Sequence, residues 1–290
     1  MLICSPAEAY HFCRRVNPVD VSWPFLQRAL IALKLIAQFN GRPGSRYVAP
    51  SEFLSNVITA HGTHRPIHTC TGLRSRYQGL CPTSESKSDI KTRRGLPTSG
   101  SMIFSSVGSD LKKDADILLG TVNMLLSEGG NLWLLRWSGD YQALAESARK
   151  LGIGDRLIAS DAVHAPKGLA NDYRSSDLCV QASREVGLGF SVLEAMARGA
   201  PVVAADIAGL NETVVDGHTG WLYAVGEAKV LADCISLAID DLFETDRRKA
   251  DGREWFVNGL TEKRFSQTRK CSTRFQPLIA ASLRVVSPRN

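Results

Sequence analysis

The chain has 290 residues, of which 44% are hydrophobic and 22% are charged. This composition is that of an ordinary globular protein, and it excludes a collagen-like repeat, general disorder and a small disulfide-dense scaffold. No apolar run reaches the roughly 18 residues that a membrane-spanning helix needs, and residues 1–15 do not resemble a signal peptide. The seven cysteines are scattered and odd in number, which is typical of a reducing compartment, so we expect a cytoplasmic protein.

Charge is segregated along the chain. Residues 1–100 carry 13 Lys and Arg against 5 Asp and Glu, residues 101–245 carry 11 against 20, and residues 246–290 carry 11 against 4. The basic ends are compatible with an anionic lipid surface, a phosphorylated substrate or a solvated surface. No nucleic-acid partner is expected, because zinc-finger spacing, aromatic-rich sheet motifs and repeats are missing from the sequence.

The first hundred residues contain few predicted elements. A helix is expected over 23–38, where apolar residues recur at spacings of three and four. A short strand over 46–50 and a helix that starts at Ser51 follow it. Residues 82–101 are polar, basic and rich in Pro, Gly and Ser, which predicts a linker with a domain boundary near residue 98.

Beyond this linker, short apolar strands alternate with helices. Strands are expected over 102–107, 132–136, 156–159, 178–182, 201–205 and 220–223, and helices over 116–126, 142–150, 167–175, 191–198 and 229–240. This alternation predicts an α/β fold with a parallel sheet that is covered on both faces. In such sheets ligands bind at the carboxyl ends of the strands, where the strand order reverses.

Residues 183–220 hold the best candidates for chemistry. Gly187 and Gly189 follow a predicted strand, and a helix begins near Phe190. Glycines let the backbone approach a ligand, and a helix N-terminus offers N–H groups and a positive dipole end, so this unit can hold a phosphate. Glu194, one turn into the helix, could accept hydrogen bonds from ribose hydroxyls. By spacing alone, ordinary turn glycines and a solvated Glu194 are the simpler interpretation.

Several sequence blocks occur in a fixed order along the chain. They are Val48-Ala-Pro-Ser-Glu-Phe, Leu151-Gly-Ile-Gly-Asp-Arg, Tyr173-Arg-Ser-Ser-Asp, Gly187-Leu-Gly-Phe-Ser-Val-Leu-Glu with its continuation to Ala204, Gly209-Leu-Asn-Glu-Thr, and Asp216-Gly-His-Thr-Gly-Trp-Leu. With these blocks the sequence resembles the retaining glycosyltransferases of family 4, which have the GT-B fold. The resemblance implies transfer of a hexose from a nucleoside diphosphate sugar, as co-substrate, to an acceptor hydroxyl with retention of the anomeric configuration.

The resemblance also implies roles for particular residues. Glu194 matches the family glutamate that binds the nucleotide ribose. The backbone expected to hold the donor and its diphosphate belongs to Gly187, Gly189, Phe190 and Ser191. A second family glutamate contacts the donor sugar from eight positions earlier, where this chain has Val186. Glu185, one position before Val186, is therefore the candidate for that contact.

Cations are expected in the loop after the first strand of the second domain. Lys113 matches the family lysine that neutralises the departing diphosphate, and fixed cations there lower the barrier. Ser109 stands where the family has an arginine, and Lys112 is the candidate to supply the lost charge, although an ammonium lacks the two-pronged geometry of a guanidinium. A solvated lysine pair is the alternative. His164 follows the family loop near the nucleotide base. No metal is expected, because Lys113 and the helix N-terminus take over the task of a cation.

The resemblance divides the chain into three parts. Residues 1–97 are expected to form a partial N-terminal, acceptor-side Rossmann-like portion, residues 98–245 the donor-binding domain, and residues 246–290 a basic helical segment that packs back toward the first part. Family members carry a complete first domain, so a nucleotide-sugar-binding remnant, or a subunit that needs a partner chain, stays open as an alternative. The expected acceptor is a saccharide or a lipid-linked saccharide, with peripheral contact at the inner face of the membrane.

Other catalytic classes find no support in the sequence. The residues His61, His64, His68 and Cys70 do not have the spacing of a standard zinc site, and we interpret them as part of a loop. The chain has neither the strand–turn–helix serine motif of α/β-hydrolases nor a Walker-type phosphate loop.

Overall fold

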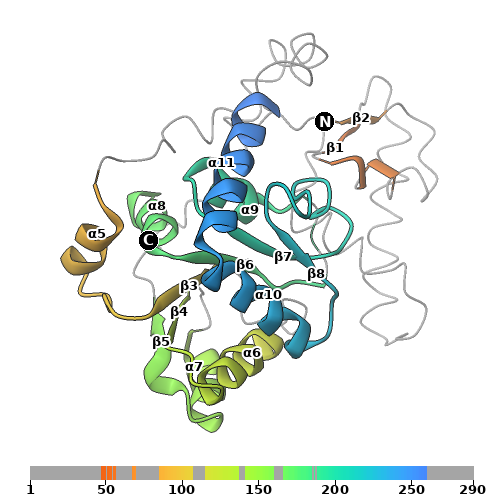
Figure 1. Cartoon of the computed structure of the whole chain (residues 1–290). Helices are drawn as coiled ribbons and strands as arrows, with labels where there is room; N and C mark the ends of the chain where they lie inside the picture. Colours follow the sequence, from red (N-terminus) through yellow and green to blue (C-terminus); the bar gives the residue numbers. More distant parts are fainter. Residues whose placement is uncertain are drawn as a thin grey trace, which may run out of the picture.

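The computed structural model describes residues 47–49, 51–53, 55–56, 67–69, 85–106, 115–136, 141–159, 166–184, 186 and 188–259. The strands β1 (Tyr47–Ala49) and β2 (Ile67–Thr69) form a two-stranded parallel sheet. A six-stranded sheet forms the centre of the remaining described part (Figure 1). Its strands are β3 (Ser101–Ser105), β4 (Leu132–Arg136), β5 (Leu157–Ala159), β6 (Leu178–Gln181), β7 (Val202–Ala205) and β8 (Trp221–Tyr223).

All neighbouring strands of the larger sheet are parallel, in the order β5-β4-β3-β6-β7-β8. This is the order of doubly wound α/β folds, in which the chain first builds outward from β3 in one direction and then returns to build in the other. The reversal places the switch point between β3 and β6. The carboxyl ends of these two strands are therefore where a ligand is expected.

Helices cover both faces of the sheet, as right-handed crossovers require (Figure 1). One face carries α6 (Ala115–Ser127), α7 (Tyr141–Lys150) and α10 (Ala228–Asp240), and α6 contacts both of the others. The opposite face carries α8 (Pro166–Ser175), α9 (Phe190–Ala197) and α11 (Leu242–Gly259), with α11 packed on α9. A 3-10 turn, η2 (Gly154–Arg156), leads into β5.

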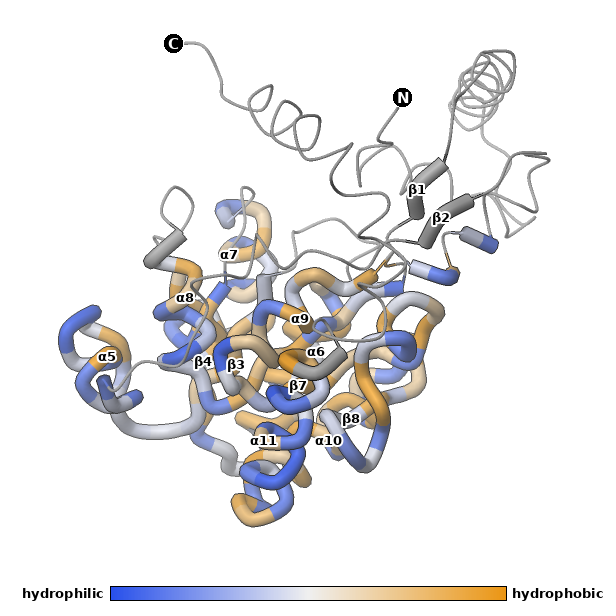
Figure 2. Tube along the Cα trace, turned by 90° about the horizontal axis from the view of Figure 1, so that it is seen from above, coloured by the Kyte–Doolittle hydropathy of each residue, from blue (hydrophilic) through white to orange (hydrophobic). Residues whose placement is uncertain are grey.

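Burial explains why these segments form central strands. All four residues of β6 and of β7 are buried, and so are four of the five residues of β3. A strand that is covered on both faces needs a continuous apolar run rather than an alternating pattern. Figure 2 shows the hydrophobic residues gathered around the sheet and the inner sides of α6 and α9. The predicted parallel α/β sheet is confirmed.

The observed elements agree closely with the predicted ones beyond residue 101, and the predicted strand near residue 46 is observed as β1. Two predictions before residue 101 were wrong in part. The expected linker contains a helix, α5 (Lys87–Arg93), because the Ser86 hydroxyl accepts a hydrogen bond from the Asp89 amide and Ile90 is buried at 1% exposure. His68, expected in a loop, lies in β2. The helix expected over 23–38 lies outside the described residues.

No helix in the part of the chain that the structure describes is long and apolar enough to cross a membrane.

Candidate functional site

The start of α9 lies beside the carboxyl end of β6, at the switch point of the sheet. Gly189 is the residue before the helix, with φ 71° and ψ 53°, in the left-handed region that favours glycine. A Cβ atom on Gly189 would also lie 2.5 Å from Cδ2 of Leu210. Gly189 is therefore required both by its backbone conformation and by the close approach of Leu210.

The first turn of α9 can offer amide groups to an anion. Gly189 has no side chain, so no side-chain cap closes this end of the helix. The first N–H groups of an α-helix have no acceptor within the helix, and the helix dipole adds positive potential there. The predicted residues Gly189, Phe190 and Ser191 lie in this turn. The arrangement can hold a phosphate, as predicted from the sequence.

A residue of the sheet holds the side chain of Ser191 in place. Its hydroxyl donates a hydrogen bond to the Oε1 atom of Gln181, the last residue of β6. Gln181 in turn donates from Nε2 to the Oγ atom of Ser183 over 2.9 Å, and both side chains are buried. This chain of hydrogen bonds ties the first turn of α9 to the end of β6. Sequence reasoning missed Gln181, because no spacing pattern links it to Ser191.

Glu194 projects from the second turn of α9, where Tyr173 and Arg198 contact it. The hydroxyl of Tyr173, on α8, lies 3.2 Å from Oε2 of Glu194 and donates to it. Arg198, at the end of α9, donates from Nη1 to the backbone oxygen of Glu194 over 3.0 Å. Tyr173 belongs to one of the blocks that carry the family resemblance, but its contact with Glu194 is visible only in the structure.

A buried arginine lies at the carboxyl end of β4. Arg136 is 1% exposed, and its Nη1 atom donates to the Ser105 hydroxyl at the end of β3 over 2.8 Å. Burial lowers the pKa of Arg136 to about 10. The guanidinium therefore remains charged at neutral pH, next to the edge of the sheet where a ligand is expected. Sequence reasoning missed this residue, although a charge that ends an apolar strand such as LWLLR is an unusual signal.

The turn around residues 207–214 connects this site with the first part of the chain. Leu210 and Thr213 approach Gly189, while the Glu212 carboxylate between them accepts hydrogen bonds from the backbone amides of Glu52 and Phe53 over 3.0 and 2.7 Å. A carboxylate at these amides satisfies the orphan donors at the start of the helix predicted to begin at Ser51. The segment that follows β1 is thus held directly by the turn that packs on the start of α9.

Five predicted site residues cannot be placed. They are Lys112, Lys113, His164, Glu185 and Gly187, and all lie outside the described residues. The structure therefore places Gly189, Phe190, Ser191 and Glu194 around the start of α9. The predicted roles of Lys112, Lys113 and Glu185 stay predictions.

A cavity of about 380 Å³ lies at the opposite edge of the sheet, lined by Ser101, Asp177 and Pro201 at the amino-terminal ends of β3, β6 and β7. None of the predicted site residues lines it. The space beside Ser191 is only about 10 Å³ and lies beneath α9, among Tyr173, Gln181 and Ser191. We nevertheless place the site at the carboxyl edge, because parallel α/β sheets bind ligands there.

Known proteins resemble this chain in sequence. A family model described as "Glycosyl transferases group 1" matches residues 102–241. The lipopolysaccharide core biosynthesis mannosyltransferase LpsB of Rhizobium meliloti (strain 1021) is 36% identical over 258 residues, which are 81% of this chain and 70% of that protein. The D-inositol 3-phosphate glycosyltransferase of Nocardia farcinica (strain IFM 10152) is 37% identical over 99 residues, 34% of this chain but only 22% of that protein.

Solved structures resemble it in fold. Anabaena Alr3699/HepE, solved in complex with UDP and glucose, has a TM-score of 0.70 at 19% identity and covers 90% of this chain and 69% of its own. The C-terminal domain of a glycosyl transferase group 1 protein (LpcC) from Francisella tularensis has a TM-score of 0.57 at 18% identity, over 64% of this chain and 98% of its own. The fold is thus that of the GT-B glycosyltransferases. Because the mannosyltransferase is 36% identical over most of this chain and the family model matches the six-stranded sheet, the protein belongs to the glycosyl transferases group 1 family.

Proposed function

We propose that this chain is a retaining glycosyltransferase that moves a sugar from a nucleoside diphosphate donor to an acceptor hydroxyl. One observation carries the proposal. At the switch point of the sheet, α9 opens on the left-handed Gly189 and carries Glu194 one turn later. Amide groups at the helix start suit the donor diphosphate, and a carboxylate one turn away suits the ribose hydroxyls.

The comparisons support a sugar donor and a saccharide acceptor. One protein of similar fold was solved with UDP and glucose, and one relative is a lipopolysaccharide core mannosyltransferase. We therefore propose a nucleoside diphosphate hexose as the donor and a saccharide, free or lipid-linked, as the acceptor. A lipid-linked acceptor would bring the protein to the inner face of a membrane.

The remaining roles in the proposed reaction come from the family resemblance. Lys113, assisted by Lys112, would neutralise the charge that develops on the departing diphosphate, which is where fixed cations lower a barrier. Glu185 would contact the donor sugar, Gly187 would bring the backbone close to it, and His164 would contact the base. A resident metal is not required in this scheme, because the lysines and the start of α9 supply the positive potential.

Nucleotide binding tests the donor site. Isothermal titration with UDP, GDP and ADP and their hexose conjugates should identify one preferred base. Glu194→Ala removes the ribose acceptor and should weaken that nucleotide about 10- to 100-fold, since hydrogen bonds to a charged group contribute about 1.5 to 3 kcal/mol. Glu146→Ala is the matched control, because Glu146 lies on the exposed side of α7 with its side chain 61% exposed. Equal affinity in the wild type and Glu194→Ala would remove Glu194 from the ribose role.

Product analysis tests transfer. A transferase should release free nucleoside diphosphate from the preferred donor mainly when a saccharide acceptor is added, and the new glycosidic bond should keep the anomeric configuration of the donor. A chain that binds the nucleotide and releases none with any acceptor would instead be the binding-only alternative or a subunit that needs a partner chain.

A further inference from the structure

Tyr173 is a buried aromatic residue that reaches Glu194 from a different element of the fold. It lies on α8, 2% exposed, and its hydroxyl donates to Oε2 of Glu194 over 3.2 Å. This distance is long for an O–H···O bond, but hydrogen bonds at sites without ligand often tighten only in the complex. The contact joins α8 and α9.

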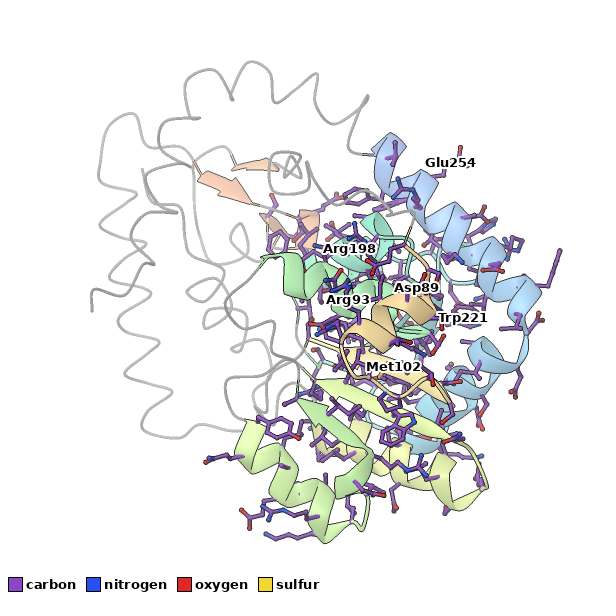
Figure 3. The ribbon with its side chains drawn as sticks, turned by 90° about the vertical axis from the view of Figure 1, so that its left-hand side faces the viewer. Asp89, Arg93, Met102, Arg198, Trp221 and Glu254 are labelled. Carbon is purple, nitrogen blue, oxygen red and sulfur yellow. The ribbon has the colours of Figure 1, made fainter. Side chains whose placement is uncertain are left out.

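The phenol ring has little freedom to move. Phe104, on β3, meets the ring edge-on, with ring centroids 4.8 Å apart and an interplanar angle of 80°. The guanidinium of Arg198 lies over the same ring, 4.9 Å from its centroid. Figure 3 shows Arg198 at the end of α9, beside α8. Both contacts have geometries that are favourable for aromatic rings, and together they fix where the hydroxyl points.

Arg198 also contacts Glu194, at its backbone. Its Nη1 atom donates to the backbone oxygen of Glu194, and Arg198 is buried, with 6% of the residue exposed. One guanidinium therefore contacts the ring of Tyr173 and the backbone of Glu194. The side-chain oxygen and the main-chain oxygen of Glu194 are thus fixed by two groups that also contact each other.

The hydroxyl of Tyr173 can donate a hydrogen bond to Glu194 at neutral pH. Burial, and then the negative charge of Glu194, raise the pKa of Tyr173 well above its ordinary value. The phenol therefore stays protonated at neutral pH. A carboxylate oxygen that accepts from it still has acceptor capacity, because the two oxygens of a carboxylate offer about four lone-pair sites.

We infer that Tyr173 is a positioning residue for nucleotide recognition, whose hydroxyl holds the Glu194 carboxylate in the orientation that receives the ribose hydroxyls of the donor. The inference rests on the proposed function, because it needs Glu194 to contact ribose. It adds a residue on α8 to the ribose contact that the sequence assigns to Glu194 on α9. Arg198 and Phe104 fix Tyr173, so the site depends on three elements of the fold.

Tyr173→Phe removes the hydroxyl and keeps the ring, so the contacts with Phe104 and Arg198 remain. Titration of this variant uses two probes, the nucleoside diphosphate that the wild type prefers and its 2′,3′-dideoxy analogue. The ribonucleotide should bind about 3- to 10-fold more weakly, as expected for the loss of one hydrogen bond. The affinity for the dideoxy analogue should not change, because that analogue has no ribose hydroxyls that can donate hydrogen bonds to Glu194.

A second buried tyrosine provides the matched control. Tyr223 is also 2% exposed and lies on β8, which β7 separates from β6. Tyr223→Phe should leave the affinities for both nucleotides unchanged. A double mutant completes the test: in a Glu194→Ala background, Tyr173→Phe should cause no further loss, because its effect acts through the missing carboxylate.

Each contrary result has a distinct meaning. Equal weakening of both nucleotides by Tyr173→Phe would show a general structural effect and overturn the inference. Unchanged binding in Tyr173→Phe, together with a loss in Glu194→Ala, would also overturn it while leaving the proposed donor site intact. If Glu194→Ala itself binds the ribonucleotide like the wild type, the ribose role fails, and the proposed donor site and this inference fail together.

Discussion

Replacing Gly189 by alanine tests the backbone geometry at the start of α9. The residue has φ 71°, where an L side chain costs about 1 to 2 kcal/mol, and a Cβ atom would lie 2.5 Å from Cδ2 of the fully buried Leu210. Overpacking of this kind typically costs a further ~1 to 3 kcal/mol. Gly189→Ala should therefore destabilise the fold by roughly 2 to 5 kcal/mol, from the left-handed backbone and the overpacking together.

Gly199, just after the other end of α9, is a matched control. Its φ of 68° carries the same conformational penalty, but an added Cβ would meet nothing within 4 Å. The difference between Gly189→Ala and Gly199→Ala isolates the overpacking against Leu210. At about 2 to 4 °C per kcal/mol for a protein of this size, the melting temperature of Gly189→Ala should be roughly 2 to 12 °C lower than that of Gly199→Ala.

The assay measures thermal unfolding and nucleotide affinity in both variants. Gly189→Ala should also bind the preferred nucleoside diphosphate more weakly, because relief of the contact with Leu210 displaces the first turn of α9. Gly199→Ala should bind it like the wild type. Equal melting temperatures in the two variants would refute the steric argument, and wild-type affinity in Gly189→Ala would show that the start of α9 does not hold the nucleotide.

Two further variants test contacts outside the site. Glu212→Ala removes the acceptor of the Glu52 and Phe53 amides, so these amides should exchange hydrogen faster. The free energy of unfolding should fall by roughly 0.5 to 2 kcal/mol. Unchanged exchange at the two amides would contradict this expectation. Hydrogen bonds from Arg247 and Arg248 lower the pKa of Glu244 to about 2. The stability it contributes is complete above its ordinary pKa of 4.5 and is lost as the pH falls toward 2. Glu244→Gln should therefore reduce the fall in melting temperature between pH 5 and 2, and an unreduced fall would argue against the ion pair.

The elements of the larger sheet follow from local sequence. Strand β4 occupies the predicted residues, and α9 begins at Phe190, one residue before the predicted helix. Continuous apolar runs and helical periodicity are properties of neighbouring residues, so they can be read without the fold. The same local argument failed at α5, because two buried residues, Ile90 and Lys91, and a serine cap decide that helix rather than a periodic pattern.

The residues of the candidate site also differ in how far the sequence could predict them. Gly189 and Glu194 could be proposed from the sequence, since the motif that resembles the family lies along one loop and one helix. Lys112, Lys113 and Glu185 remain predictions that only an experiment on those residues can test.

The sequence by itself determined the α/β class, the glycine-opened helix and the carboxylate one turn into it. Only the tertiary structure decided what surrounds that carboxylate. Tyr173 precedes Glu194 by 21 residues. Glu212 accepts a hydrogen bond from the amide of Glu52, which lies 160 residues earlier in the chain. Such contacts depend on the order of the strands and the side of the sheet on which each crossover helix lies. Because these are set by the packing of the whole domain, no local pattern of residues encodes them.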